Sequence, residues 1–180
     1  VVGGEIELPG AIILAGIAAL RAGAGKLQLA TCKSIAPQVG IAVPESLSIS
    51  LDETREGTIA RDAARQLKAH TVDLDAILIG PGTRAGNDNT AFVTRLLQQC
   101  RHVPVILDAG ALDALHDEPD ALSAHDRNAI LTPHWGEISR LLSIDLSVVA
   151  TRPAVVARQA AESLQAVVVL KGARSFIATP

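Results

Sequence analysis

The chain has few of the residues that mark disulfide scaffolds, metal clusters or base-stacking surfaces. Its 180 residues include two cysteines, one tryptophan, two phenylalanines and no tyrosine or methionine. Cys32 and Cys100 fit neither a metal-ligand spacing nor a disulfide framework, so a reducing cytoplasm is the expected compartment. Because aromatic residues make up only 2% of the chain, a platform for stacking nucleic acid bases is not expected.

Excess positive charge and long apolar runs are also missing. A net charge of −3 and a pI near 5.9 argue against a general nucleic-acid binder, which usually presents a basic face. No apolar run is long enough to cross a bilayer. The segment Ala11–Leu20 is apolar but short, and it lacks the basic flank of a secretion signal, so it is predicted to be a buried helix. We therefore expect neither a nucleic-acid nor a membrane partner.

What the chain does have is enough apolar material for one core. With 48% hydrophobic residues over 180 positions, residues 1–180 are predicted to form a single domain. Short apolar runs predict strands at Lys26–Thr31, Leu47–Leu51, Ala76–Gly80, Val103–Asp108, Ala129–Leu131 and Val167–Leu170. Helical patterns predict helices at Pro9–Arg21, Ser34–Val39, Thr58–His70, Asn89–Cys100, Gly136–Leu142 and from Thr151 to Leu164. This alternation favours an α/β fold with a mostly parallel sheet and helices on both faces.

Smaller segments complete the prediction. Val1–Gly4 is predicted to be the end of a strand, and Ser175–Thr179 the antiparallel partner of the strand before it. Ala111–Leu115 is predicted to be a helical turn, and Asp117–Asn128 a polar connection. Both ends of the chain resemble elements that have been cut, so we expect a longer native chain.

The most informative stretch is Ala129–Glu137, with the sequence AILTPHWGE. An apolar strand enters a turn at Thr132 and then opens a helix. In open α/β sheets, ligands bind at the carboxyl ends of strands, beside helix N–H groups that have no partner yet. His134 is placed at that rim. The alternative is an ordinary loop histidine or a buried histidine with satisfied hydrogen bonds.

Three other predicted strands end in residues suited to a polar ligand. These residues are Gly80, Gly82 and Thr83 after the first strand, Asp108 after the second, and Lys171 with Gly172 after the third. Each has an ordinary structural explanation: a turn, a helix cap or a solvated hairpin end. Their shared position at strand ends favours one common site. The phosphate-binding loop GxxxxGK[ST] and the dinucleotide fingerprint GxGxxG are both absent, as are HExxH and GxSxG.

Several motifs together resemble one family. The segments GAIILAGIAALRAGAG, ILIGPGT, VILDAGAL, ILTPHWGEISRLL and VVVLKGARSFIATP occur in that order. They resemble the ADP/ATP-dependent NAD(P)H-hydrate dehydratases over nearly the whole chain. The first helix and TPHxGE are specific to that family, whereas GPG and LKG are shared more widely. The resemblance implies a three-layer ribokinase-like sandwich.

The resemblance also implies an activity and a set of contacts. Such enzymes use ADP or ATP to remove water from the hydrated nicotinamide ring, regenerating NADH or NADPH. The nucleotide is thought to phosphorylate the ring hydroxyl so that phosphate leaves. The residues assigned to the hydrated substrate are Ala11, Gly80, Gly82, Asp108, His134 and Glu137. Those assigned to the nucleotide are Lys171, Gly172, Ala173, Arg174 and Ser175.

The chain departs from the family pattern in two places. The family usually continues GPG as GPGLG, but Thr83 and Arg84 stand here instead. Arg84 is expected either to contact phosphate or to be solvated, and solvation is favoured. The family also carries a later GTGD-type segment that supplies an anion hole and the aspartate expected to act as base. That aspartate would lie beyond Pro180, so the chain alone is expected to bind weakly and not to turn over.

Two other functions stay open from the residues alone. One is a ribokinase-like kinase that phosphorylates a sugar or a hydroxymethyl-pyrimidine-type alcohol, since fold does not fix function. The other is a nucleotide-binding module without turnover. For the favoured reading, the expected partners are an adenine nucleotide, which could carry Mg²⁺, and hydrated NADH or NADPH. No metal bound by the protein is expected, and the resemblance implies a homotetramer.

Overall fold

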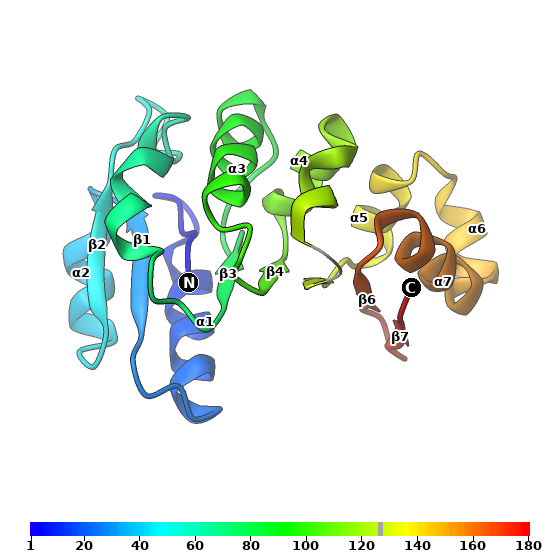
Figure 1. The fold of residues 1–180 in the computed structure, drawn as a ribbon, viewed down its shortest axis with the longest axis horizontal. Helices are drawn as coiled ribbons and strands as arrows, with labels where there is room; N and C mark the ends of the chain where they lie inside the picture. Colours follow the sequence, from blue (N-terminus) through cyan, green and yellow to red (C-terminus); the bar gives the residue numbers. More distant parts are fainter. Residues whose placement is uncertain (126–127) are drawn as a thin grey trace.

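The computed structural model describes residues 1–125 and 128–180 as a sheet flanked by helices (Figure 1). The strands are β1 Gln28–Cys32, β2 Leu47–Leu51, β3 Ile77–Ile79, β4 Val105–Leu107, β5 Ala129–Leu131, β6 Val167–Leu170 and β7 Phe176–Ala178. The α-helices are α1 Pro9–Arg21, α2 Ala36–Ala42, α3 Asn87–Gln99, α4 Gly110–Asp117, α5 Trp135–Leu141, α6 Leu146–Thr151 and α7 Pro153–Leu164. Two 3₁₀ helices, η1 Ala63–His70 and η2 Pro119–His125, lie between them.

The sheet is parallel except at one edge. β1 pairs with β2, and the order β3-β4-β5-β6-β7 is parallel up to β6 and antiparallel between β6 and β7. Val2 bridges Ala30 on β1 and Ile79 on β3, and thereby joins the two groups of strands. The predicted parallel sheet, the strand end at Val1–Gly4 and the antiparallel partner at the C-terminal side are all confirmed. The carboxyl ends of β3 to β6 therefore meet at one edge.

Alternating strand residues divide the core between two faces. Ile79, Leu107 and Leu131 are buried in the main cluster, which α3 to α7 cover. In β1, the alternate residue Leu29 instead joins a smaller cluster with Ile12 of α1, because successive strand residues point to opposite faces. Helices thus lie on both faces, as predicted. Figure 1 shows α2 at one end of the molecule and α7 at the other.

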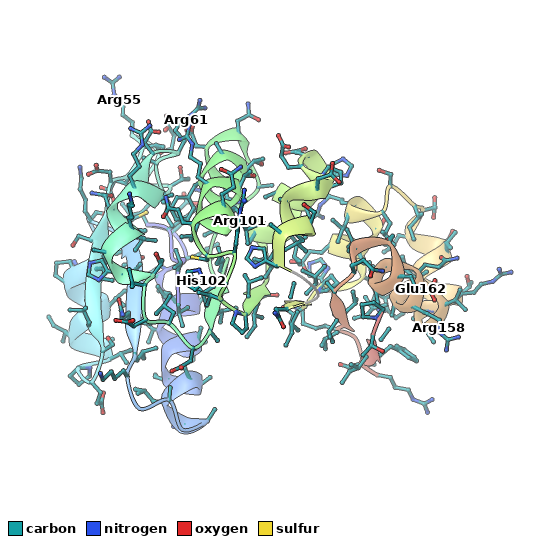
Figure 2. The ribbon with its side chains drawn as sticks, viewed as in Figure 1. Arg55, Arg61, Arg101, His102, Arg158 and Glu162 are labelled. Atoms are coloured by element: carbon teal, nitrogen blue, oxygen red, sulfur yellow. The ribbon has the colours of Figure 1, made fainter. Side chains whose placement is uncertain are left out.

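The face opposite the main cluster is more open along β5 and β7. Ile130 is 38% exposed and Ile177 is 72% exposed, whereas their neighbours in each strand are more buried. Charged side chains such as Arg158 and Glu162 project outward from α7 (Figure 2). Within residues 1–125 and 128–180, every helix is too short or too polar to span a bilayer.

The α-helix predicted for Thr58–His70 is wrong at its start. Ile59 instead forms an antiparallel bridge with Glu53, and the helix that follows is η1, of 3₁₀ type. The backbone amides of Thr54 and Ala60 donate to carbonyls at Thr58 and Asp52, so this turn uses groups that a helix would need. Ile59, Ala63 and Leu67 are nonetheless buried.

Other helices differ from their predicted limits. The predicted helical turn at Ala111–Leu115 is the longer helix α4, and the predicted connection Asp117–Asn128 contains η2; residues 126 and 127 of that connection lie outside the described residues. Thr151 does not cap α7 as predicted. It ends the unpredicted helix α6, which begins where the Asp145 carboxylate accepts a hydrogen bond from the amide of Ser147 at 2.7 Å.

Candidate functional site

The first wall of the candidate site forms where the loop after β3 meets the start of α1. Gly82 has φ +75°, and a Cβ there would lie 2.6 Å from the Leu8 carbonyl oxygen and 3.0 Å from the Cβ of Ala11. Only glycine therefore lets this loop approach α1 so closely. Ala11 and Gly82, two predicted substrate residues, are consequently neighbours. Gly80 lies in the same loop, and a Cβ there would lie within 2.9 Å of both the carbonyl carbon of Asp108 and the Cβ of Ala111.

The centre of the site is an ion pair between two strand ends. The Lys171 ammonium, at the end of β6, lies 2.5 Å from Asp108 Oδ1 at the end of β4. The hydroxyl of Thr132, which follows the intervening strand β5, donates to the same carboxylate oxygen at 2.8 Å. The side chains of Lys171 and Asp108 are 42% and 28% exposed, so the pair faces solvent at the rim. Lys171 was predicted for the nucleotide and Asp108 for the substrate, and the structure brings the two together.

The second wall is the start of α5, where His134 is the N-cap. His134 Nδ1 accepts hydrogen bonds from the amides of Gly136 and Glu137 at 2.9 and 3.2 Å. The Glu137 carboxylate accepts from the amide of His134 at 2.7 Å, which completes a capping box. Because Nδ1 must be an acceptor, this hydrogen-bond pattern assigns the ring proton to Nε2. The His134 side chain is 56% exposed.

The local role of Glu137 differs from that of His134. Glu137 is 8% exposed, and one of its oxygens is committed to the His134 amide. Its other oxygen lies 3.5 Å from His134 Nε2, which is longer than an ordinary hydrogen bond. The imidazole N–H therefore makes no short hydrogen bond to Glu137, whose carboxylate holds the turn in shape.

The predicted nucleotide segment is an exposed turn behind Lys171. Lys171 pairs with His134 in an isolated parallel bridge, and its amide donates to the Pro133 carbonyl at 2.8 Å. The residues that follow, Gly172, Ala173, Arg174 and Ser175, are all exposed. A Cβ on Gly172 would lie 2.9 Å from Trp135 Nε1, so the indole packs against this turn. The two predicted binding segments thus share one edge.

Arg84 is solvent-exposed, as favoured, with 44% of its side chain accessible, but its guanidinium is also engaged by two carboxylates and is not placed as a free phosphate ligand. Its guanidinium Nε lies 2.9 Å from Glu5 and its Nη1 lies 2.6 Å from Glu7. The hydrogen bond that Arg84 donates to the Glu5 side chain, followed by the charges of Glu7 and Glu5, raises the pKa of Arg84 above its ordinary value. Its neighbour Thr83 is buried, and the Thr83 hydroxyl donates to the Gly80 carbonyl at 2.9 Å, which closes the loop.

Glu5 and Trp135 are the site residues that sequence reasoning missed. Glu5 belongs to none of the motifs, and Trp135 stood only as the variable position of TPHxGE. Glu5 and Arg84 are 79 residues apart, so their opposite charges gave no local signal. A buried carboxylate near a glycine turn becomes visible only once the loops are placed side by side.

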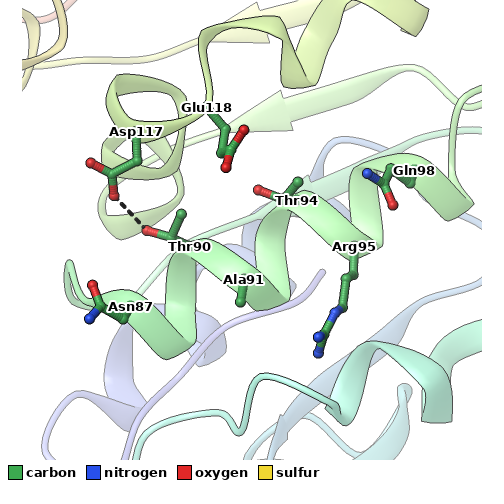
Figure 3. Close-up of a pocket in the computed structure, with 8 residues that line it drawn as sticks. All are labelled: Asn87, Thr90, Ala91, Thr94, Arg95, Gln98, Asp117 and Glu118. Carbon is green, nitrogen blue, oxygen red and sulfur yellow. Dashed lines mark hydrogen bonds between the residues drawn. The ribbon is translucent and has the colours of Figure 1, made fainter.

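Two hollows lie away from these residues. One, of about 530 Å³, runs between α3 and α4, where Thr90 donates to Asp117 at 3.0 Å (Figure 3). The other, of about 930 Å³, lies beside α1 and reaches Leu78 and Ile106 on the open face of the sheet. The predicted site residues line neither hollow and form an open rim. Among the residues that the structure describes, no group of three or more His, Cys, Asp or Glu side chains is placed to hold a metal.

Neither cysteine belongs to the site. Burial raises the pKa of the Cys32 thiol to about 12, with the charges of Glu53 and Glu5 adding to the effect. Burial likewise raises the pKa of the Cys100 thiol to about 11. Because the thiolate is the reactive form, both side chains behave as small apolar core residues.

Comparison with known proteins gives one consistent family. A family model described as NAD(P)H-hydrate dehydratase, of the carbohydrate kinase group, matches residues 1–180. The chain is 44% identical over 180 residues to the ADP-dependent (S)-NAD(P)H-hydrate dehydratase of Xanthomonas campestris pv. campestris, covering 100% of this chain and 60% of that protein. The chain thus spans less than two thirds of the length of this relative.

Solved structures give the same fold. The ADP/ATP-dependent NAD(P)H-hydrate dehydratase of Bacillus subtilis, co-crystallised with ATP and Mg²⁺ and soaked with CoA, matches with a TM-score of 0.74 and 29% identity, covering 99% of this chain and 60% of that one. A ribokinase-like protein of Enterococcus faecalis matches with a TM-score of 0.82 at 22% identity, covering 99% and 58%. The predicted ribokinase-like fold is confirmed.

Proposed function

Because the chain belongs to the NAD(P)H-hydrate dehydratase family, we propose that it forms the binding rim of an ADP- or ATP-dependent dehydratase. The proposed substrates are the S-forms of hydrated NADH and NADPH, and the product is the restored dinucleotide. We assign binding and orientation, and no catalytic base, to the residues of this chain. A cytoplasmic setting and a homotetrameric assembly belong to the same proposal.

One observation carries the proposal. The Asp108–Lys171 ion pair at 2.5 Å joins the segment proposed for the hydrated ring to the segment proposed for the nucleotide. A phosphoryl transfer needs donor and acceptor held within about 3–3.5 Å in line, so both ligands must meet at one edge. The contacts of Ala11 with Gly82, of Gly80 with Asp108, and of Lys171 with Asp108 and His134 fit that requirement.

On the substrate side, we propose that His134 donates its Nε2 proton to an oxygen of the hydrated ring. The backbone amides at the start of α5 fix the ring tautomer, so the donor is oriented before the ligand arrives. Ala11 and Gly82 form the opposite wall, where small residues leave room for a flat ring. We propose that Gly80, Asp108 and Glu137 hold the loops that make these contacts in position.

On the nucleotide side, we propose that Lys171 acts as a point charge on phosphate while Asp108 holds it in place. The exposed residues Gly172 to Ser175 would follow the nucleotide along the turn. Mg²⁺, where present, would arrive on the phosphates with its own waters, because the described residues offer no carboxylate cage for it.

The test is direct. The purified full-length protein is incubated with S-hydrated NADH and either ADP or ATP, and separately with a panel of sugars and ATP. Recovery of the NADH absorbance band with release of phosphate, and no sugar phosphate, is the expected result. Sugar phosphorylation would favour the kinase instead. Nucleotide-dependent thermal stabilisation without any product would favour a binding module.

A variant of His134 separates a ligand contact from a helix cap. Asn is among the best N-cap residues, so His134→Asn should keep α5 and the melting temperature while removing the Nε2 donor. We expect weaker binding of the hydrated dinucleotide and unchanged ADP binding. His134→Ala, which also loses the cap, should cost about 1 kcal/mol of stability in addition. Equal loss of both ligands in His134→Asn would assign the residue a structural role.

A further inference from the structure

We propose that Arg84 is a positioning residue that holds the loop after β3 against the loop before α1. It thereby fixes the distance between Gly82 and Ala11, which form the proposed substrate wall. The clamp consists of Arg84, Glu5 and Glu7. This inference rests on the proposed function, because the wall it holds is the one formed by Ala11 and Gly82.

The clamp is bidentate on one carboxylate and reaches a second. The Arg84 backbone amide lies 3.3 Å from Glu5 Oε1, and its Nε lies 2.9 Å from Glu5 Oε2. The Nη1 atom of the same guanidinium lies 2.6 Å from Glu7 Oε2. Three donors of a single residue therefore hold two carboxylates of the opposite loop, a geometry that suits the rigid guanidinium fork.

Burial makes the Glu5 contact the important one. The Glu5 side chain is 1% exposed, whereas that of Glu7 is 67% exposed. A buried carboxylate is costly unless it is paired and hydrogen-bonded, and Arg84 supplies both the charge and the donors. Glu7 is screened by water and adds little. Removing Arg84 would leave the Glu5 carboxylate buried without its cation, so this loop would have to move.

The same two loops are joined along their backbones. The amide of Gly4 donates to the Pro81 carbonyl at 2.8 Å, and the amide of Glu5 donates to the Gly82 carbonyl at 3.0 Å. Arg84 closes this row of contacts two residues beyond Gly82. The distance between Gly82 and Ala11 is therefore set by the backbone pairing on one side and by the clamp on the other.

The clamp occupies the position where the chain departs from GPGLG. A guanidinium already engaged with two carboxylates is a poor ligand for a substrate phosphate, because that phosphate would have to displace at least one of them. The geometry thus favours a role through the wall over direct contact with substrate.

The test is a double-mutant cycle on the purified full-length protein. Arg84→Gln, Glu5→Gln and the double variant are compared for kcat, for KM of S-hydrated NADH and for KM of ADP. We expect each single variant to raise KM for the hydrate about tenfold with little change in kcat or in KM for ADP, since a loosened wall misplaces one ligand only. The double variant should lose no more than either single variant, because the two residues act as one unit.

Two further variants serve as controls for this cycle. Arg84→Lys keeps the charge and should restore part of the hydrate affinity. Arg95→Gln removes a surface arginine that pairs with Asp62 at 2.5 Å, and it should leave every kinetic constant unchanged. If wild type does not act on the hydrate, the proposed function fails, and the clamp is then tested by whether the same cycle is non-additive in melting temperature.

Three results would overturn the clamp. An Arg84→Gln effect that Glu5→Gln does not share would mean that Arg84 touches the substrate itself. Additive effects in the double variant would mean that the two residues act separately. Parallel changes in KM for the hydrate, KM for ADP and kcat would mean a general structural role.

Discussion

Replacing Gly82 by Ala adds one methyl group at the tightest point of the candidate site. The residue has φ +75°, and the new Cβ would lie 2.6 Å from the Leu8 carbonyl oxygen and 3.0 Å from the Cβ of Ala11. The nearest atom belongs to the backbone, so no side-chain rotation relieves the contact. Gly23→Ala is a matched control: its φ is +102°, but a Cβ there meets nothing within 4 Å.

Two costs add in Gly82→Ala and only one applies in the control. A left-handed conformation costs an L-residue about 1–2 kcal/mol, which Gly23→Ala should show alone. Forcing an extra methyl into a packed contact costs about 1–3 kcal/mol more. Gly82→Ala should therefore lower the free energy of unfolding by about 2–5 kcal/mol, or the melting temperature by about 4–20 °C for a chain of this size.

Urea and thermal denaturation of wild type and both variants measure these differences. We also expect Gly82→Ala to weaken binding of the hydrated dinucleotide, because Ala11 must shift away, while ADP binding at Lys171 stays close to that of wild type. If Gly82→Ala unfolds with the same free energy as Gly23→Ala, the loop does not press on α1. The account of the substrate wall would then be refuted.

Three further predictions concern the core and the nucleotide side. Burial lowers the pKa of His125 below its ordinary 6.5, so the unfolded state takes up this proton at a higher pH than the folded state. The contribution of neutral His125 to the free energy of unfolding should therefore be fully present above pH 6.5 and fall as the pH drops below 6.5. His125→Gln should remove this part of the pH dependence of the melting temperature. Cys32 and Cys100 should resist a thiol reagent at pH 8 in the folded protein and react fully in denaturant, and labelling of the native state at the rate of free cysteine would contradict their burial. Lys171→Met should weaken ADP binding about tenfold and Lys171→Arg less so, measured by calorimetric titration.

Much of the fold follows from apolar periodicity. The runs that became β3, β4, β5 and β6 are short, continuous and separated by helical patterns, which is typical of a parallel sheet covered by helices. The helix predicted for Thr58–His70 failed because a turn that pairs Glu53 with Ile59 used its first backbone groups. Helix α6 was missed because its β-branched residues, Val148 and Val149, gave no helical signal.

The candidate site, too, could be predicted only in part. Strand ends could be predicted as ligand positions, since parallel strands deliver their carboxyl ends to one edge. The assignment of individual residues to substrate or nucleotide stays a prediction. The sequence pattern could not show that Lys171 and Asp108, which are 63 residues apart, form an ion pair.

The sequence by itself determined the order of the strands and of most helices, the glycine positions that permit close turns, and the family. Those properties depend on neighbouring residues, on side-chain periodicity and on motifs, all of which are local. Only the tertiary structure decided that Arg84 is held by Glu5 and that backbone amides hold the His134 ring at Nδ1, which assigns its proton to Nε2. Charge pairing and burial depend on which distant loops the fold brings into contact, so residue types alone leave them open.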